Sequence, residues 1–428
     1  MILKGNIVYM TDKNTCIELE NGYLSIKNGI IEKVYSNSEF PASKYKNEDF
    51  FDYGNKLIIP GMTDLHLHAS QYGFRGLGMD LELMDWLNEH AFAEEKKFSN
   101  MRYANEMYNN FADELIKSPT TRACIFATIH TNSTLSFASI LDRRGFSAFV
   151  GKVNMDRGSP AELTENTEQS VKDTEEFIRA VLSECKNIKP IITPRFVPSC
   201  TDELMTELGK LREKYDLPVQ SHLSENPEEI KLVKKLNPKA RFYGDAYDMF
   251  GLFGGNYKAV MAHCVYSSDD EMELMRKNGV YIAHCANSNY SLSSGIAPIR
   301  KYLDYGLKVG LGTDIAGGFS ISMFRAIQDT IAVSKLLWRQ DEKSPKPLSF
   351  KEAFYLATMG GGEFFGKVGS FIAGYEADIL VLDDSCEKYP VPVSLEERLE
   401  RICYLSENNS VYAKYIKGKL VMKKGNGF

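Results

Sequence analysis

The first sign of chemistry in this chain is a pair of histidines, His66 and His68, that follows the apolar run at 57–59. Side chains alternate between the two faces of an extended strand, so residues i and i+2 point the same way. Both imidazoles would therefore project from one strand end, as half of a metal site. The pair alone is weak evidence, because such pairs also arise by chance in solvated strands.

Further polar residues stand at the ends of predicted strands later in the chain. His222, His263 and Asp314 each close or follow a short apolar run, and Glu225 comes three residues after His222. If these strands form one parallel barrel, their carboxyl ends meet at one face. Three imidazoles and one carboxylate would meet there, in a shell suitable for Zn²⁺. The four candidate metal ligands are His66, His68, His222 and Asp314.

A metal site of this kind points to hydrolysis, because a bound metal lowers the pKa of its water to about 7. Glu225 is near the metal but not needed as a ligand, so it is a candidate proton shuttle. His263 is a candidate hydrogen-bond partner for the attacking water or the tetrahedral centre. Arg195, which closes the fourth predicted strand, either recognises a carbonyl or anion or pairs with a surface acid. Gln71 is either a site residue or an ordinary loop amide.

The remaining histidines receive no catalytic role. His130 and His284 also end predicted strands, but the metal shell has no position left for them. We therefore interpret them as supporting or packing residues. His90 lies in a long loop without an identifiable partner.

The elements that must position these residues form an alternating pattern of strands and helices. Such alternation predicts an α/β fold with a closed (β/α)8 TIM-like barrel, whose active site lies at the carboxyl ends of the strands. Helices are expected at 201–215 and 269–278. The eight expected strands are 58–68, 124–130, 147–153, 189–196, 218–222, 258–263, 280–284 and 308–313.

The two chain ends have a different texture, with short β-rich runs and an Asn28-Gly29 hairpin signal. Neither end is long enough to fold alone, so we expect one small β-sandwich domain built from both. The predicted division is 1–57 and 370–428 for this domain and 58–369 for the barrel. The long connection at 69–100 is expected to be either a lid over the site or a surface excursion.

Composition excludes several classes of protein. The 428 residues carry 51 basic and 57 acidic side chains, a formal net charge of −6, which argues against a nucleic-acid surface. We expect no signal peptide and no membrane partner, since no apolar segment is long enough to cross a bilayer. Scattered cysteines without a Cys-x-x-Cys pair favour reduced thiols and a cytoplasmic protein.

Taken together, the motifs resemble the amidohydrolase superfamily, over about residues 55 to 370. The strand-end histidines and aspartate are shared widely in that superfamily. Three motifs are narrower and resemble its guanine-deaminating members. These are 69–72 (Ala-Ser-Gln-Tyr), 194–196 (Pro-Arg-Phe) and 221–226 (Ser-His-Leu-Ser-Glu-Asn). Ala286 departs from the pattern, where proline is expected after the cysteine, but it lies outside the proposed shell.

The resemblance implies one Zn²⁺ per chain, because Arg195 stands where a second metal would require a lysine carbamate. It implies guanine as substrate, hydrolysed to xanthine and ammonia, in a homodimer. Glu225 would carry a proton from the attacking water to ring N3, while Asp314 and His263 hold the nucleophile for attack at C2. Asp314 would relay a further proton as ammonia leaves. Recognition would fall to Arg195 at O6, Gln71 at the purine edge and Phe196 against the ring.

Two alternatives stay open. One is another deaminase of the same superfamily, acting on cytosine, a triazine or an adenine derivative. The other is a non-catalytic assembly protein on the same scaffold, against which the retention of Glu225 and all four candidate ligands speaks. The His-x-Glu and Pro-Cys-x-x-Cys pattern of cytidine-deaminase-type zinc sites is missing from the sequence.

Overall fold

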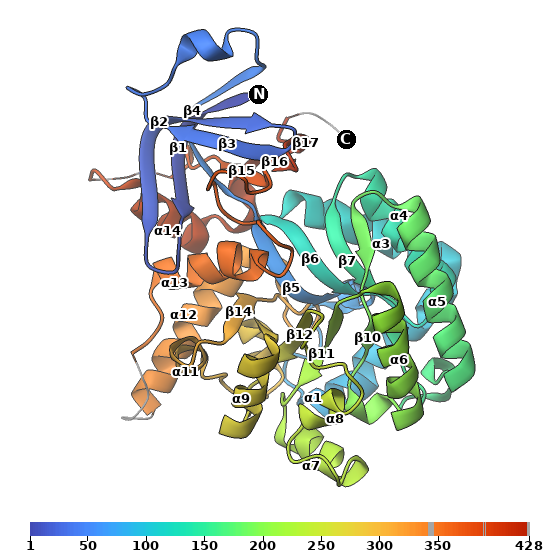
Figure 1. Cartoon of the computed structure of the whole chain (residues 1–428). Helices are drawn as coiled ribbons and strands as arrows, with labels where there is room; N and C mark the ends of the chain where they lie inside the picture. Colours follow the sequence, from blue (N-terminus) through green and yellow to red (C-terminus); the bar gives the residue numbers. More distant parts are fainter. Residues whose placement is uncertain (341–345, 388, 390, 426–428) are drawn as a thin grey trace.

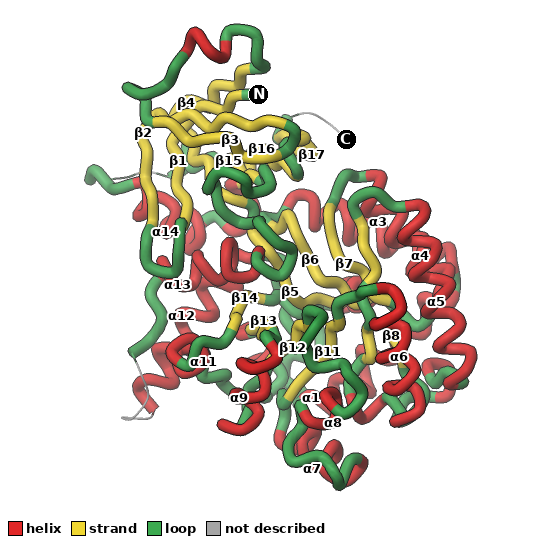
Figure 2. Tube along the Cα trace, viewed as in Figure 1, coloured by secondary structure: helices red, strands yellow, loops and turns green. Residues whose placement is uncertain are grey.

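The computed structural model describes residues 1–340, 346–387, 389 and 391–425 of the chain. A barrel of parallel strands wrapped by helices forms the larger part of the molecule, and a β-sheet made from both chain ends lies at one side of it (Figure 1). In Figure 2, the sheet made from the chain ends consists mainly of strands, whereas the barrel is surrounded by helices. The predicted α/β barrel is confirmed.

The barrel strands follow one another in chain order and pair in parallel. The short strands β8 and β10 pair with each other, and they continue the third and fourth strands of the barrel beyond β7 and β9. The first half contains β5 (Met62–His68), β6 (Thr120–Phe126), β7 (Ser147–Gly151), β8 (Val153–Asn154), β9 (Ile188–Pro190) and β10 (Thr193–Pro194). The second half contains β11 (Val219–Leu223), β12 (Ala259–His263), β13 (Tyr281–His284) and β14 (Lys308–Leu311).

The ring closes between its first and last strands. The N–H of Asp314 donates to the carbonyl of His66 at 2.8 Å, and the N–H of His68 donates to the carbonyl of Ile315 at 2.8 Å. On the other side, a parallel bridge between Ile192 and Val219 joins the two halves. Closure therefore places the first and last strand ends, with their polar residues, directly beside each other.

Helices follow the strands as expected, and their ends are specified locally. Thr201 caps the predicted 201–215 helix by accepting the N–H of Leu204 at 3.2 Å. Gly279 ends the 269–278 helix in the left-handed region, with φ +65°. The longer helices are α3 (Met101–Lys117), α4 (Thr131–Arg143), α5 (Thr167–Glu184), α6 (Asp202–Tyr215), α7 (Pro227–Leu236), α9 (Asp269–Asn278), α12 (Met323–Gln340) and α14 (Leu395–Leu405). The short ones are α8 (Asp245–Asp248), α10 (Ala286–Ser291), α11 (Ile299–Asp304) and α13 (Phe350–Tyr355).

Several sequence-based strand boundaries are wrong, and the expected 189–196 strand is divided into β9 and β10. Two of the errors concern the first two barrel strands. Residues 58–60 belong to β4 (Phe50–Pro60) of the other sheet, and the first barrel strand begins at Met62. His130 does not end a strand, because β6 stops at Phe126 and His130 lies at the start of α4. Both errors have one cause: an apolar run shows that a strand is present, but it does not show where hydrogen bonding to the neighbouring strand begins and ends.

Both chain ends contribute to one seven-stranded sheet, in the order β17-β16-β15-β4-β1-β2-β3. Asn28 and Gly29 both have positive φ, as the tight hairpin between β2 and β3 requires. Its sandwich form and the domain boundaries stay predictions; β4 runs across the boundary expected at 57. The strands are β1 (Ile2–Met10), β2 (Cys16–Lys27), β3 (Ile30–Tyr35), β4, β15 (Ile379–Leu382), β16 (Val411–Ile416) and β17 (Lys419–Lys423).

A buried ion-pair cluster anchors this sheet to the barrel. Arg122, near the start of β6, donates to Asp378 from Nε at 2.5 Å, and its Nη2 donates to Glu376 at 2.6 Å. Lys414 is fully buried and donates to the carbonyls of Leu115 and Thr120 at 3.0 and 2.7 Å. The anchor thus lies at the opposite end of β6 from the carboxyl ends of the barrel strands.

The connection at 69–100, which we call the roof segment, is built from short helical turns, including α1 (Leu83–Trp86) and α2 (Phe92–Glu95). It buries Trp86, Leu87 and Phe92 against the rest of the barrel. Among helices of the described residues, none has both the length and the apolar character that crossing a bilayer needs.

Candidate active site

The ligand atoms that the sequence predicts converge at the carboxyl ends of the barrel strands. His66 Nε2 and His68 Nε2 lie 3.2 and 3.5 Å from Asp314 Oδ1, and His68 Nε2 lies 3.2 Å from His222 Nε2. Tetrahedral ligands about 2.1 Å from a zinc ion lie about 3.4 Å from one another. Each of these three separations is close to that value, as expected for neighbouring ligands of one ion.

The protonation of these groups also fits a divalent cation. Nδ1 of His222 lies 2.6 Å from the Arg195 carbonyl, which only accepts, so Nδ1 carries the hydrogen and Nε2 keeps a free lone pair. His66 Nε2 is buried and makes no hydrogen bond within the described chain. Burial lowers the pKa of His66, His68 and His222, which favours the neutral, metal-binding form. The donor set thus suits the metal of the predicted shell.

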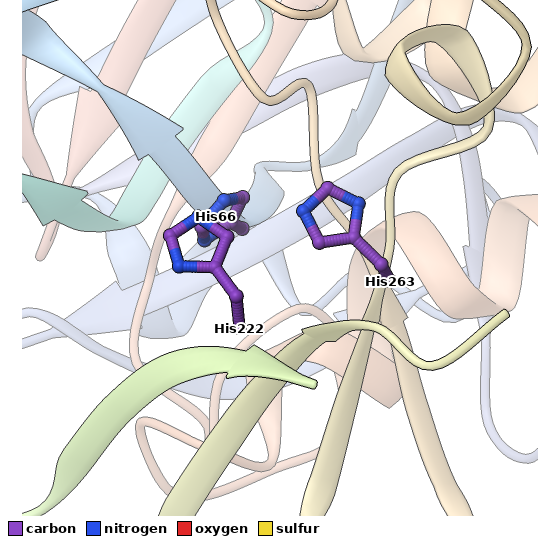
Figure 3. A group of neighbouring side chains, drawn as sticks. All are labelled: His66, His222 and His263. Atoms are coloured by element: carbon purple, nitrogen blue, oxygen red, sulfur yellow. The ribbon is translucent and has the colours of Figure 1, made fainter. Parts of the chain in front are cut away.

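Figure 3 shows the rings of His66, His222 and His263 approaching one another from three strand ends. His263 and Asp314 have φ of +72° and +50°, a left-handed conformation that is costly for residues with a Cβ. Burial would raise the pKa of Asp314, but the imidazoles of His66 and His263 hold it below its usual range. Asp314 is therefore an anion at neutral pH, in a position the backbone is strained to reach.

Glu225 lies beside the ligand cluster. Its Oε2 is 3.3 Å from His263 Nε2, and its Oε1 accepts a hydrogen bond from Ser294 at 3.0 Å. Burial raises the pKa of Glu225 to about 7. A carboxyl group with a pKa near neutral can both accept and return a proton at low cost. The position of Glu225 is fixed from behind by Glu229, whose carboxylate accepts the backbone N–H of Glu225 at 3.1 Å.

His263 is held in a defined orientation. Its Nδ1 lies 2.8 Å from the side-chain oxygen of Asn289, so Nδ1 carries a hydrogen if the amide is oriented with its oxygen inward. Burial alone would lower the pKa of His263, but the negative charges of Glu225 and Asp314 raise it. His263 Nε2 is also within 3.8 Å of Asp314 Oδ2. The imidazole is thus placed between the two carboxylates that flank the cluster.

The other predicted site residues lie in the same pocket. Arg195, Gln71 and Phe196 line it together with His68, His222, Glu225 and Asp314. The roof segment contributes its apolar wall, through Leu83, Trp86 and Leu87. Arg195 is not paired with a surface acid, because its guanidinium and its partner Glu95 are both buried. The sequence left two interpretations of the roof segment, a lid over the site or a surface excursion. Its contribution to the pocket wall agrees with the first.

Sequence reasoning missed the residues that support the site. Glu95, Glu229, Ser294 and Asn289 contact its predicted members, and none of them ends a predicted strand. A capping-box pattern at the start of α7 was the one available signal, since Glu229 also caps that helix. The three unassigned histidines lie elsewhere: His90 stacks on Phe74, His130 lies at the start of α4, and His284 is buried at the end of β13.

Comparison with known proteins defines the class. The family model described as "Amidohydrolase family" matches residues 57–421, which include the barrel, the ligand cluster and part of the small sheet. The chain belongs to the amidohydrolase family.

Its relatives narrow the comparison further. Over 98% of both chains it is 37% identical to a guanine deaminase of Dictyostelium discoideum. It is 41% identical to the guanine deaminase of Rattus norvegicus, over 86% of this chain and 83% of the relative. The crystal structure of a guanine deaminase from C. acetobutylicum, with guanine bound in its active site, superposes with a TM-score of 0.95 at 48% identity, covering 98% of this chain and 99% of the other.

Proposed function

We propose that this protein is a metal-dependent hydrolase that converts guanine and water to xanthine and ammonia. One observation carries the proposal: a single pocket joins a His/Asp cluster with metal-ligand spacing to a buried arginine and a fixed amide. The first group activates water, and the second recognises a planar heterocycle with a carbonyl oxygen. The similarity to guanine deaminases over nearly the whole chain supports the same substrate.

In the proposed complex, the purine lies between the roof segment and Phe196. Arg195 has five N–H donors, of which one is used by Glu95, so others are available to the O6 carbonyl. The amide of Gln71 meets the purine edge. An adenine ring would place its amino group against the buried guanidinium. Both groups are hydrogen-bond donors, so both would stay unpaired, which lowers the binding affinity. The pocket therefore favours an oxo-purine.

His66, His68, His222 and Asp314 would hold the ion, which we propose to be Zn²⁺ at one per chain. When bound, the ion supplies a Lewis acid that lowers the pKa of a water molecule to about 7. Glu225 would take a proton from the attacking water and deliver it to ring N3, which makes C2 electrophilic. His263 and Asp314 would orient the attacking oxygen, and Asp314 would then pass the second proton of that oxygen to the amino group, so that the C2–N bond breaks and ammonia leaves.

Two further parts of the proposal concern the whole molecule. We propose a homodimer because the sequence resembles that of the family. We propose a cytoplasmic location because the cysteines are free in the described residues, as is usual in a reducing compartment.

The direct test is to incubate the purified, zinc-loaded protein with guanine and follow the ultraviolet spectrum while ammonia is assayed. We expect the guanine spectrum to become that of xanthine, with one ammonia released per guanine. Adenine, cytosine and a triazine serve as the comparison substrates. Turnover of one of these and not of guanine would assign the chain to another deaminase of the family.

A further inference from the structure

The carboxylate of Glu95 joins the two polar recognition residues from behind. Glu95 ends α2 of the roof segment and is 2% exposed. Its Oε2 accepts a hydrogen bond from Arg195 at 2.5 Å, and its Oε1 accepts one from Gln71 Nε2 at 2.9 Å. Gln71 and Arg195 line the pocket, whereas Glu95 is not among the lining residues of the described chain. Glu95 therefore reaches a substrate only through these two side chains.

The hydrogen bonds around Gln71 fix which way its amide faces. The backbone N–H of Ala316 donates to Gln71 Oε1 at 3.1 Å, and a backbone N–H can only donate. The Glu95 carboxylate at the other end can only accept. The amide oxygen must therefore face Ala316 and the amide nitrogen must face Glu95, so a flip would oppose two donors at one end and two acceptors at the other.

Arg195 is held on two sides by the same short helix. Besides the ion pair with Glu95, its guanidinium lies over the ring of Phe92, 5.1 Å from the centroid. Both groups come from α2, three residues apart in the chain. The orientation of the guanidinium thus depends on a segment that is separated from Arg195 by about a hundred residues.

We propose that Glu95 is a positioning and specificity-determining residue: its two oxygens set the donor pattern that Arg195 and Gln71 present to the substrate. This inference rests on the proposed function for the identity of the substrate, guanine. Glu95 does not touch the reacting atoms, so its contribution is to binding and to discrimination among purines.

The chain offers a matched pair of variants on this helix. Glu94 is also buried, but its carboxylate accepts from Tyr103 and from Lys97 (2.7 Å) and makes no hydrogen bond to Arg195 or Gln71 in the described residues. In Glu95→Gln, the new NH2 group can accept from neither partner, so one of the two hydrogen bonds must be lost. In Glu94→Gln, both contacts of Glu95 remain.

Steady-state kinetics of the zinc-loaded protein separates a positioning role from a general structural one. For Glu95→Gln we expect KM for guanine to rise about 10- to 100-fold, as for loss of hydrogen bonds to a charged group, with a smaller fall in kcat. The preference for guanine over adenine should fall as well. Glu94→Gln should retain wild-type KM and preference. Equal effects of the two substitutions, or a fall in kcat alone, would overturn the inference.

A double-mutant cycle adds a sharper criterion. If Glu95 acts through Arg195, the effects of Glu95→Gln and Arg195→Ala on kcat/KM are less than additive when combined. Strict additivity would contradict the proposal. A crystal structure of Glu95→Gln gives a readout that does not depend on the substrate. We expect Arg195 or Gln71 to be reoriented, and unchanged orientations of both side chains would contradict the proposal. Wild-type protein that does not turn over guanine would remove the proposed function, while this structural result would still test Glu95.

Discussion

The two ends of the pocket are built in different ways. At the metal end, every candidate ligand lies within three residues of the carboxyl end of a barrel strand, and each ligand atom lies within 3.5 Å of a neighbouring one. At the recognition end, Arg195 and Gln71 are held by Glu95, which lies on a short helix outside the barrel. The first end is therefore set by topology, and the second by side-chain contacts with the roof segment.

This difference shows how one scaffold can keep its reaction while its substrate changes. Strand ends are fixed by the hydrogen bonding of the whole barrel, so a metal cluster placed there is rigid. A roof built from short turns can change its sequence without disturbing that pairing. We therefore expect substitutions at the metal end to abolish the reaction, and substitutions at the recognition end to alter mainly affinity and preference.

The largest effect is expected for His222→Ala. Removing Nε2 of His222 opens the shell and leaves Asp314 and two imidazoles, so bound metal and nearly all turnover should be lost. Elemental analysis and a guanine assay on the same sample measure both. His284→Ala is the matched control, a buried strand-end histidine outside the cluster, and it should keep its metal. A His222→Ala protein with full metal content would refute the assigned shell.

Next in size is Glu225→Gln. The amide cannot carry the proton from water to the purine, so kcat should fall about 10²- to 10⁴-fold while metal content stays unchanged. The exposed Glu228, in the first turn of α7, gives the control Glu228→Gln, which should behave as wild type. Retention of the wild-type rate by Glu225→Gln would exclude Glu225 as the proton carrier.

Arg195→Ala should have an intermediate effect at the recognition end. Loss of a charged hydrogen bond to the substrate carbonyl is expected to raise KM about 10- to 100-fold, with metal content intact. Competition between guanine and adenine measures the change in preference. An unchanged preference would show that Arg195 does not contact the distinguishing carbonyl.

The smallest effect on turnover is expected at the anchor of the small sheet. Asp378→Asn removes the fully buried one of the two carboxylates that pair with Arg122 and leaves only the partly exposed Glu376, which should reduce the free energy of unfolding by about 1.5–3 kcal/mol. Because the anchor lies at the other end of β6 from the site, turnover per folded molecule should not change. Denaturant titration measures stability and the guanine assay measures activity; a parallel loss of kcat would mean that the two regions are coupled.

The contrast between the two ends also explains what the sequence can predict. His66 and His68 are recognisable because a strand places i and i+2 on one face, and the later ligands follow apolar runs of strand length. Glu95 has no such signal: it lies in a segment without a strand or helix period, and its partners are 24 and 100 residues away. The resemblance to known motifs singled out Gln71 and Arg195, but it could not show what holds them.

The most direct test is a metal titration. The protein is stripped with a chelator, Zn²⁺ is returned in steps, and bound zinc and guanine turnover are measured on each sample. We predict no turnover without metal, a rise in proportion to bound zinc, and a plateau at one ion per chain. Full turnover of guanine by the metal-free protein would contradict the central claim that the His/Asp cluster holds the ion on which hydrolysis depends.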